Sequence, residues 1–372
     1  MMSIIFRYIT KSFMKNFLII ISCFFFVIAI LESMEVIRRY FSNSININYL
    51  DIIKLTCCHT IVNIFSFFPF IIFLSSIVFF AVMHNKLELT AMKVMGISTF
   101  NIAKALLAST IVLGLSYITI LDGLSAISVD KIFKLDTMIR SKSRGTDNSL
   151  TITNKGIWFR DTYDSSSYII HARHLDIKDK SLFNIRVFEF GDNGELKSTI
   201  YSEKASISDG YWKLDNAKVV DIENNEVKPK LIQLQTKLRF SDINKMVAQP
   251  GSISFWSMKK YISMLEKVGL SSIKYVSRLF ITISSILQMI SFVILATAVC
   301  ISYNARDSKK YIYKVSALLS SAFPIYFLNN IFVAFGENGN ISIKVASFLI
   351  PIVTAFAGIL LSIRGSILGL NR

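Results

Sequence analysis

Six long apolar segments constrain this chain more than any other feature of its sequence. They cover roughly residues 15–34, 56–83, 97–121, 276–303, 311–335 and 341–363. A helix crosses the ~30 Å hydrocarbon core of a bilayer with about 20 apolar residues, and each segment reaches that length. Hydrophobic residues make up 52% of the 372-residue chain, which is high for a water-soluble protein. The sequence therefore predicts a membrane protein with six transmembrane helices.

Basic residues in the short loops predict the orientation of these helices. Four segments carry many basic and few acidic residues: the start of the chain, the loop between the second and third runs, the loop between the fourth and fifth, and the end of the chain. Their basic residues are Arg7, Lys11, Lys15, Lys86, Lys93, Arg306, Lys309, Lys310, Lys314, Arg364 and Arg372. By the positive-inside rule, both termini and residues 86–98 are cytoplasmic, and the hydrophilic segment 122–270 lies on the other side.

Two further expectations follow from length and charge. The first apolar run is too long for a signal-peptide core and no convincing cleavage site follows it, so we expect it to be retained. The segment 122–270 is nearly neutral, so most of the net charge of +16 belongs to the membrane part. That charge fits anionic lipid and gives no reason to expect a nucleic-acid partner.

The hydrophilic segment changes from helical to strand periodicity. Apolar and polar residues alternate, or β-branched and aromatic residues gather, over 152–159, 168–177, 182–190, 196–207, 211–222 and 231–240. Turn signals such as Asp209-Gly210 separate these runs. We therefore expect an all-β sandwich or jelly-roll-like domain inserted between the third and fourth spans.

The predicted organisation has three parts. Residues 1–121 hold the first three transmembrane helices, 122–257 the β-domain, and 258–372 an amphipathic helix followed by the last three spans. The amphipathic helix places apolar residues on one face, as expected of an element at the membrane interface. These residues are Met258, Tyr261, Ile262, Leu265 and Val268.

Residues 86–98 form a short, more polar segment between the second and third apolar runs. Read as a helix, they place Leu87, Ala91 and Val94 on one face, and Gly96 is the expected C-terminal stop. The nearby lysines, Lys86 and Lys93, lie two residues before and five after Glu88, and neither spacing favours a strong intrahelical pair. We therefore expect a short helix beside the bilayer whose carboxylate is available to another group.

A search for catalytic chemistry finds no standard motif. The sequence has no phosphate-binding loop, no His-Glu-x-x-His, no Gly-x-Ser-x-Gly and no Gly-x-Gly-x-x-Gly. His171 and His174 fall in a predicted strand at a spacing that points them to opposite faces, so no metal site is expected there. The cysteines, Cys23, Cys57, Cys58 and Cys300, are expected to be small buried apolar side chains without disulfides. No cofactor is predicted, and the near absence of ionisable residues deep in the spans argues against a self-powered transporter.

Short motifs along nearly the whole chain resemble one family of membrane proteins. The matching residues are Arg7-Tyr8-Ile9, Pro69, Glu88-Leu89-Thr90-Ala91-Met92-Lys93, Gly96-Ile97-Ser98, Gly156-Ile157-Trp158, Tyr211-Trp212-Lys213-Leu214, Tyr261-Ile262, Gly269 and Tyr275. The most specific is Glu-x-x-Ala followed by Gly-Ile-Ser. Together with six spans divided by a β-domain, they resemble the YjgP/YjgQ permeases, LptF and LptG, of the lipopolysaccharide exporter, and are most similar to LptG.

The resemblance implies a function and partners. An LptF-like and an LptG-like permease would form a heterodimer in the bacterial inner membrane, powered by an LptB-like ATPase dimer, with an LptC-like bitopic protein as a further partner. The subunit itself would be non-catalytic and would extract lipopolysaccharide for transport to the outer membrane. The first and fifth spans would form lateral gates, and the periplasmic jelly roll would contact LptF, LptC or the periplasmic bridge.

The resemblance also implies two groups of site residues. Glu88 would pair with a basic residue of the ATPase, with Leu87, Ala91 and Met92 packed around it and Gly96 turning into the third span. Taken alone, the adjacent Arg38 and Arg39 fit side chains that snorkel to the membrane interface as well as a pair that grips phosphates. The resemblance implies that they would face lipid A phosphates. This chain carries Glu32 where relatives can carry another basic residue, which bears on the strength of that phosphate site.

Other classes of function are compatible with parts of this pattern. The spans would merely anchor the chain if it were a periplasmic scaffold or binding protein. An intramembrane enzyme acting on lipids, using Asp122 or His171, is disfavoured because no acid, base and nucleophile constellation is present. A permease for another lipid or a lipoprotein shares every feature described so far.

Overall fold

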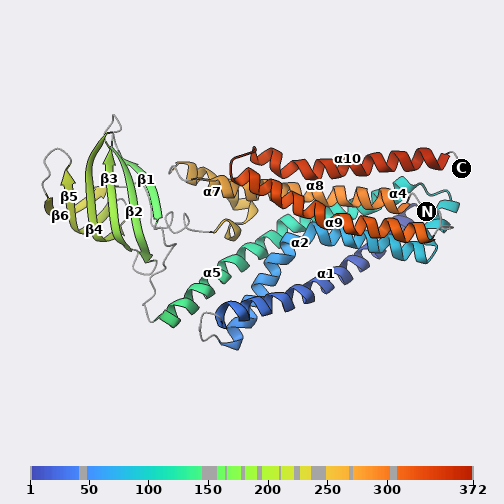
Figure 1. Ribbon diagram of the computed structural model, residues 1–372, viewed down its shortest axis with the longest axis horizontal. Coiled ribbons are helices and arrows are strands. Elements are labelled where there is room, and N and C mark those ends of the chain that lie inside the picture. Colours follow the sequence, from blue (N-terminus) through green and yellow to red (C-terminus); the bar gives the residue numbers. More distant parts are fainter. Residues whose placement is uncertain are drawn as a thin grey trace.

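The protein is elongated, with a helical bundle at one end and a β-sheet at the other (Figure 1). The computed structural model describes residues 2–41, 48–144, 157–163, 166–176, 181–190, 195–208, 211–221, 227–235, 249–267, 271–301 and 308–370. Both chain termini lie at the end of the bundle that is far from the sheet (Figure 1). The helical elements are α1 (Met2–Phe41), α2 (Tyr49–Asn85), α3 (Glu88–Val94), α4 (Thr99–Ser116), the π-helix η1 (Tyr117–Leu121), α5 (Asp122–Arg144), the 3-10 turn η2 (Pro250–Ser252), α7 (Phe255–Lys267), α8 (Ile273–Ile301), α9 (Ser308–Glu337) and α10 (Ile343–Leu370).

The six predicted spans are confirmed. Six helices among the described residues are long and apolar enough to cross a membrane: Ile4–Phe41, Tyr49–Asn85, Phe100–Ile139, Ile273–Cys300, Ile312–Glu337 and Ile343–Arg364. Each contains one of the apolar runs except for a few residues at the ends.

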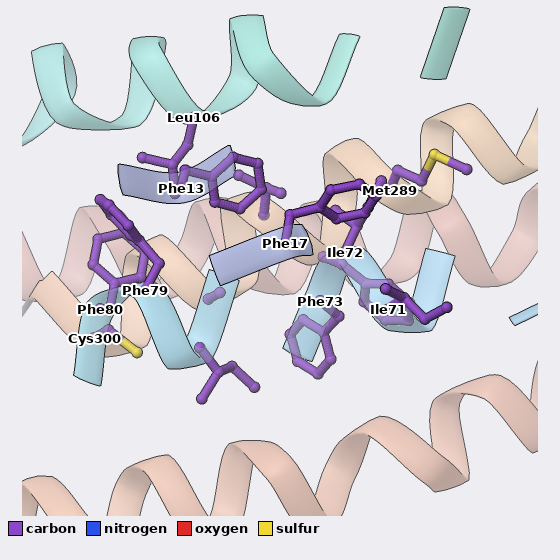
Figure 2. Close-up of a cluster of buried hydrophobic side chains, with 14 of the residues drawn as sticks. Phe13, Phe17, Ile71, Ile72, Phe73, Phe79, Phe80, Leu106, Met289 and Cys300 are labelled. Carbon is purple, nitrogen blue, oxygen red and sulfur yellow. The ribbon is translucent and has the colours of Figure 1, made fainter. Parts of the chain in front are cut away.

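Helix α2 is the centre of the bundle. Its most apolar stretch is 61% buried, and Phe73, Phe79 and Phe80 are completely buried. Phe13 of α1 packs edge-to-face on Phe79 with ring centroids 6.0 Å apart, inside a cluster that also draws on α4 and α8 (Figure 2). Lipid tails are as apolar as these side chains, so close van der Waals contact, rather than removal from water, stabilises this core.

Helices α1 and α9 are the outer helices of the bundle. Only 11% of the most apolar stretch of each is buried, against 61% in α2. Their remaining apolar surface faces away from the chain's own core. In a membrane, this surface meets either lipid or another protein.

The third span is longer than the sequence suggested. Helices α4 and α5 are joined without a break by one π-helical segment, Tyr117–Leu121, and residues 122–144, expected to begin the β-domain, are helical. Asp122, at the junction, is 1% exposed. Its carboxylate accepts a hydrogen bond from the Phe255 N–H at 2.6 Å and lies 3.3 Å from Arg278 Nη2. In the sequence, the charged residue Asp122 indicates the end of a span. In the structure, the Phe255 N–H and Arg278 compensate its buried charge, so the helix continues.

The inserted β-domain is confirmed. Its strands are β1 (Ile157–Tyr163), β2 (Ser166–Asp176), β3 (Ser181–Phe190), β4 (Leu196–Ser208), β5 (Tyr211–Asp221) and β6 (Val227–Gln235). They form one antiparallel sheet in the order β1-β2-β3-β4-β5-β6. Each strand therefore pairs with its sequence neighbour, as short connections dictate. The described strands form a single meander, whereas a sandwich or jelly roll distributes its strands over two sheets. Residues 152–156 and 236–240 of the predicted strands lie outside the described part.

Two asparagines reset the alternation of side chains in the sheet. Asn184 and Asn216 have φ values of 50° and 51°, in the left-handed region that Asn tolerates better than most residues. Strand β5 changes register against β6 between Leu214 and Ala217, and both of these residues are buried. A strict period of two would place residues three apart on opposite faces, so each asparagine brings the strand's apolar side back to the core.

The apolar face of α7 is buried in protein. Met258, Tyr261 and Leu265 belong to the same hydrophobic cluster as the buried residues of the sheet, including Trp212. Ile262 is partly buried against this cluster, and Val268 lies outside the described residues. Trp256, by contrast, is 69% exposed, as suits an aromatic residue near a membrane surface. Helix α7 is thus a structural link between the sheet and the bundle.

The cysteines differ from expectation in their burial. Cys300 is buried, Cys58 is half-buried, and Cys23 and Cys57 are exposed on the outer surfaces of α1 and α2. A thiol on the outside of a membrane helix contacts lipid as readily as a core residue contacts protein, so an apolar setting does not require burial within the chain.

Candidate functional site

Helix α3 is a separate short helix between the second and third spans. Two residues with left-handed backbone bracket it: Leu87, with φ of 57°, and Gly96, with φ of 78°. The Ser98 hydroxyl accepts a hydrogen bond from the Asn101 N–H and begins α4. Gly96 adopts its conformation at no steric cost, whereas Leu87 carries strain of about 1 kcal/mol. These two turns set α3 off from the axes of α2 and α4.

One face of α3 is anchored in the bundle. Leu89 and Met92, three residues apart, are 5% and 6% exposed and belong to the main core cluster. Met92, which the resemblance grouped with partner contacts, therefore faces the chain's own core. Burial also lowers the pKa of the Lys93 ammonium, because the charged form loses hydration in the folded chain. Folding therefore carries a cost while Lys93 is charged. This cost is relieved as the pH rises through the lowered pKa toward the ordinary value.

The opposite surface of α3 is apolar and exposed. Leu87, Val94 and Met95 are 59%, 82% and 57% exposed, and Ala91 is also exposed. The structure thus leaves the predicted face of Leu87, Ala91 and Val94 uncovered by the described part of the chain. Large exposed apolar side chains are typical of a surface that meets another protein or the membrane.

Glu88 begins α3 and has a partner from α1. Its Oε2 accepts a hydrogen bond of 2.8 Å from the Tyr8 hydroxyl. The two residues are 80 positions apart, and sequence reasoning selected Glu88 but left Tyr8 out of the site. The only signal was the position of Tyr8 in the Arg7-Tyr8-Ile9 motif. A carboxylate accepts several hydrogen bonds, so Glu88 retains acceptor capacity for a second group.

Arg38 and Arg39 lie near the other end of α1. Arg38 Nη2 is 2.7 Å from Glu35 Oε2, and Arg39 Nη2 is 3.6 Å from Glu35 Oε1. The side chain of Arg38 is 77% exposed, so it is available to an anion in spite of this pair. With 30 residues between Tyr8 and Arg38 at ~1.5 Å per residue, the two predicted sites are about 45 Å apart along one helix.

Glu32, one turn before Glu35, is held by α2. Its Oε1 accepts a hydrogen bond of 2.7 Å from Asn63 Nδ2, and its Oε2 lies 3.8 Å from His59 Nδ1. The carboxylate therefore points toward the neighbouring helix. Along α1, Arg38 and Arg39 follow Glu32 by six and seven residues, which is about 9–10 Å of helix.

The residues considered for enzymatic chemistry do not form a site together. Asp122 belongs to the buried pair with Arg278, and His171 lies in β2 opposite Arg186 of β3. Within the ranges that the structure describes, no group of three or more His, Cys, Asp or Glu side chains could hold a metal ion. His174 lies in the same strand, and its side chain is outside the description.

Comparison with known proteins identifies one family over almost the full chain. The model of the family described as lipopolysaccharide export system permease LptF/LptG matches residues 7–364. No curated protein matches the chain. The matched range includes α3, the sheet and the six spans, except for the first three residues of the first span.

Proposed function

Because the chain belongs to the lipopolysaccharide export system permease family LptF/LptG, we propose that it is a transmembrane subunit of an ATP-driven exporter. In this proposal it extracts lipopolysaccharide from the inner membrane for delivery to the outer membrane, and a separate protein hydrolyses ATP. The observation that carries the proposal is α3, a short helix with an anchored inner face and an exposed apolar outer face. When a partner bound to the exposed face moves, the anchored face of such a helix can transmit that movement to the bundle.

The proposed partner at α3 is an LptB-like ATPase, present as a dimer. Leu87, Ala91 and Val94 would pack into its groove, and Glu88 would accept a hydrogen bond from a basic residue. The Tyr8 hydroxyl holds this carboxylate in place from α1. A charge-assisted pair beside an apolar contact provides both orientation and affinity.

The proposed partner within the membrane is a second permease of the same family. Helices α1 and α9 keep most of their apolar surface outside the chain's own core. Two such subunits facing each other would enclose a space for lipid, with these helices as lateral gates. We assign this chain to the LptG side of the pair on the motifs of residues 156–158 and 261–275.

The lipid phosphates would be bound at Arg38 and Arg39. Glu35 already neutralises part of the charge of these arginines. A phosphate group carries more negative charge than one carboxylate and would compete well for an exposed guanidinium. In this arrangement Glu35 keeps the two side chains ordered until lipid binds.

The proposed orientation places both termini and α3 in the cytoplasm and the sheet in the periplasm. The loop charges support it. Strands β1 and β6 are the two edges of the described sheet. An exposed edge can pair with a strand from another protein, and an LptC-like bitopic protein or an LptF-like partner would bind there.

Affinity purification tests the proposal. The tagged full chain is isolated from mild detergent, and the proteins bound to it are identified by mass spectrometry. We expect an ATP-binding-cassette ATPase and a second six-span permease, with the ATPase lost from Glu88→Ala. Thr90→Ala is the matched control, because Thr90 is an exposed polar residue of the same helix. Recovery of neither protein with the stable, inserted wild-type chain would instead favour a membrane-anchored scaffold.

A further inference from the structure

A cavity with several polar groups in its wall lies inside the membrane-spanning part of the bundle. It measures about 200 Å³ and is lined by residues of α2, η1, α8, α9 and α10. Ser284, Ser285, Gln288 and Asn329 contribute polar side chains to its wall. The cavity is distinct from α3 and from the arginine pair.

Three irregularities in three different helical segments meet at this cavity. Pro69 of α2, Tyr117 of the π-helical turn η1 and Pro351 of α10 all line it. A proline has no N–H, so the carbonyl of Phe65, another lining residue, lacks its usual partner four residues later. Irregular backbone at membrane depth occurs where protein buries it or where it lines a water-filled space.

Two buried amide oxygens lack partners among the described residues. Gln288 is only 6% exposed, and its Nε2 donates a long hydrogen bond of 3.4 Å to Thr354 Oγ1. Its Oε1 accepts no hydrogen bond there, and neither does Asn329 Oδ1. Leaving such an acceptor unsatisfied costs about 1–3 kcal/mol each. Both residues line one cavity, and although each oxygen is covered by protein, a turn of its amide group would bring it to a hydrogen-bond donor inside the cavity.

The ligand that fits this wall is small and uncharged. None of the residues that line the cavity is Asp, Glu, Lys, Arg or His. The wall also contains the hydroxyl groups of Tyr117, Ser284, Ser285 and Tyr326. These groups can donate as well as accept. A charged ligand would find no counterion here.

We propose that this cavity is an internal hydration site within the membrane. At a liquid volume of ~30 Å³ per molecule, its capacity is about six waters. Once the amide groups turn toward the cavity, these waters donate to Gln288 Oε1 and Asn329 Oδ1, and they also donate to the freed backbone carbonyl. They occupy part of the boundary between α9, which supplies Tyr326 and Asn329, and helices α2 and α8, so α9 can shift there by exchanging hydrogen bonds with water. The inference rests on the cavity alone and does not depend on the transported lipid.

Millisecond X-ray radiolysis of the full chain in lipid nanodiscs tests the proposal. The pulse creates hydroxyl radicals from water in place, so bound waters oxidise the side chains beside them. Phe292 lines the cavity and Phe79 lies elsewhere in the core, and they are 1% and 0% exposed. We expect Phe292 to be oxidised at least about tenfold faster than Phe79. Equal rates for these two phenylalanines would overturn the proposal.

A double variant, Gln288→Leu with Asn329→Leu, tests whether the amide oxygens hold the water. We expect the oxidation of Phe292 to fall several-fold toward that of Phe79, while Phe79 itself stays unchanged. An unchanged rate at Phe292 would contradict the assigned acceptors. If this variant does not accumulate in the membrane, the comparison of the two phenylalanines in the wild-type chain decides the question.

Discussion

The hydrogen bond between Tyr8 and Glu88 joins the start of α1 to the helix proposed to meet the ATPase. It orients a carboxylate on the surface, where a free side chain would sample several rotamers. The bond spans 80 residues, and no local pattern signals it. Sequence reasoning thus finds the charged residue through its isolation but misses the group that positions it.

Tyr8→Phe removes only this hydroxyl. One hydrogen bond contributes about 0.5–1.5 kcal/mol, so we expect the purified ATPase to bind up to about tenfold more weakly. Titration of the ATPase onto the chain in nanodiscs measures this loss, which should be smaller than that of Glu88→Ala. Tyr49→Phe, at the opposite end of the bundle, is the control. Wild-type affinity in the Tyr8→Phe chain would show that Tyr8 does not position Glu88.

Gly96→Ala tests the turn after α3. No atom lies within 4 Å of the position where its β-carbon would be, so the cost comes from the φ of 78° alone. We expect a loss of about 1 kcal/mol in stability, measured by thermal unfolding in detergent. Gly123→Ala is the matched control, because Gly123 also has open space around it but lies within helix α5. Gly123→Ala should be neutral or stabilising, and an equal loss in both variants would contradict the explanation.

The junction of α4, η1 and α5 depends on a buried ion pair. Asp122 connects the third span to the start of α7 and to Arg278 of α8. The same residue marks the end of the apolar run in the sequence, which is why the predicted domain boundary falls there. A pattern of polarity reports where a helix becomes polar, but it does not report whether a partner on another helix neutralises the charge.

Asp122→Asn should destabilise the chain by about 3 kcal/mol, because it leaves Arg278 without its counter-charge in a largely buried setting. Replacing both, with Asp122→Asn and Arg278→Met, should cost clearly less than the sum of the single changes. Chemical denaturation in mixed micelles measures the four members of this cycle. Strictly additive effects would show that the two side chains do not interact.

Helices α8 and α10 pack closely at Gly358. A β-carbon added there would lie 3.0 Å from both Ile294 Cγ2 and the Leu295 backbone nitrogen. Gly358→Ala should therefore push the two helices apart and destabilise the chain by about 1–3 kcal/mol, as overpacking does elsewhere. The same unfolding measurement checks this, with Gly123→Ala again as the control. An unchanged free energy of unfolding for Gly358→Ala would mean that α8 and α10 can move apart at this contact without loss of stability.

The spans and strands of this chain were more predictable from sequence than the local irregularities within them. The six spans follow from length and apolarity, and the six strands follow from alternation, because both signals are local. The left-handed turns at Asn184 and Asn216 break that alternation, and the π-helical turn at Tyr117 belongs to a segment with ordinary helical composition. Such features arise from packing between segments, which a single sequence does not display.

The proposed orientation of the whole chain predicts which surfaces face which compartment. Single cysteines at the exposed positions Lys86 and Lys213, introduced after the four native cysteines are replaced, provide the test. A membrane-impermeant maleimide should label Lys213→Cys in intact spheroplasts and label Lys86→Cys only after the membrane is opened. Labelling in the reverse order would invert the assignment.

Helix α1 runs for 40 residues and contains neither proline nor glycine. Bends in helices arise mainly at such residues, so α1 behaves as a stiff rod of about 60 Å. A tilt of roughly 5° about its midpoint moves each end by about 2.5 Å in opposite directions. Glu88 is hydrogen-bonded to Tyr8 near one end of this rod, and Arg38 lies near the other end. A tilt of α1 would therefore move both sites together, without a chain of side-chain contacts between them. A small lateral pull on the end of α1 at Tyr8 would become an opposite displacement at Arg38, where the proposal places the lipid phosphates.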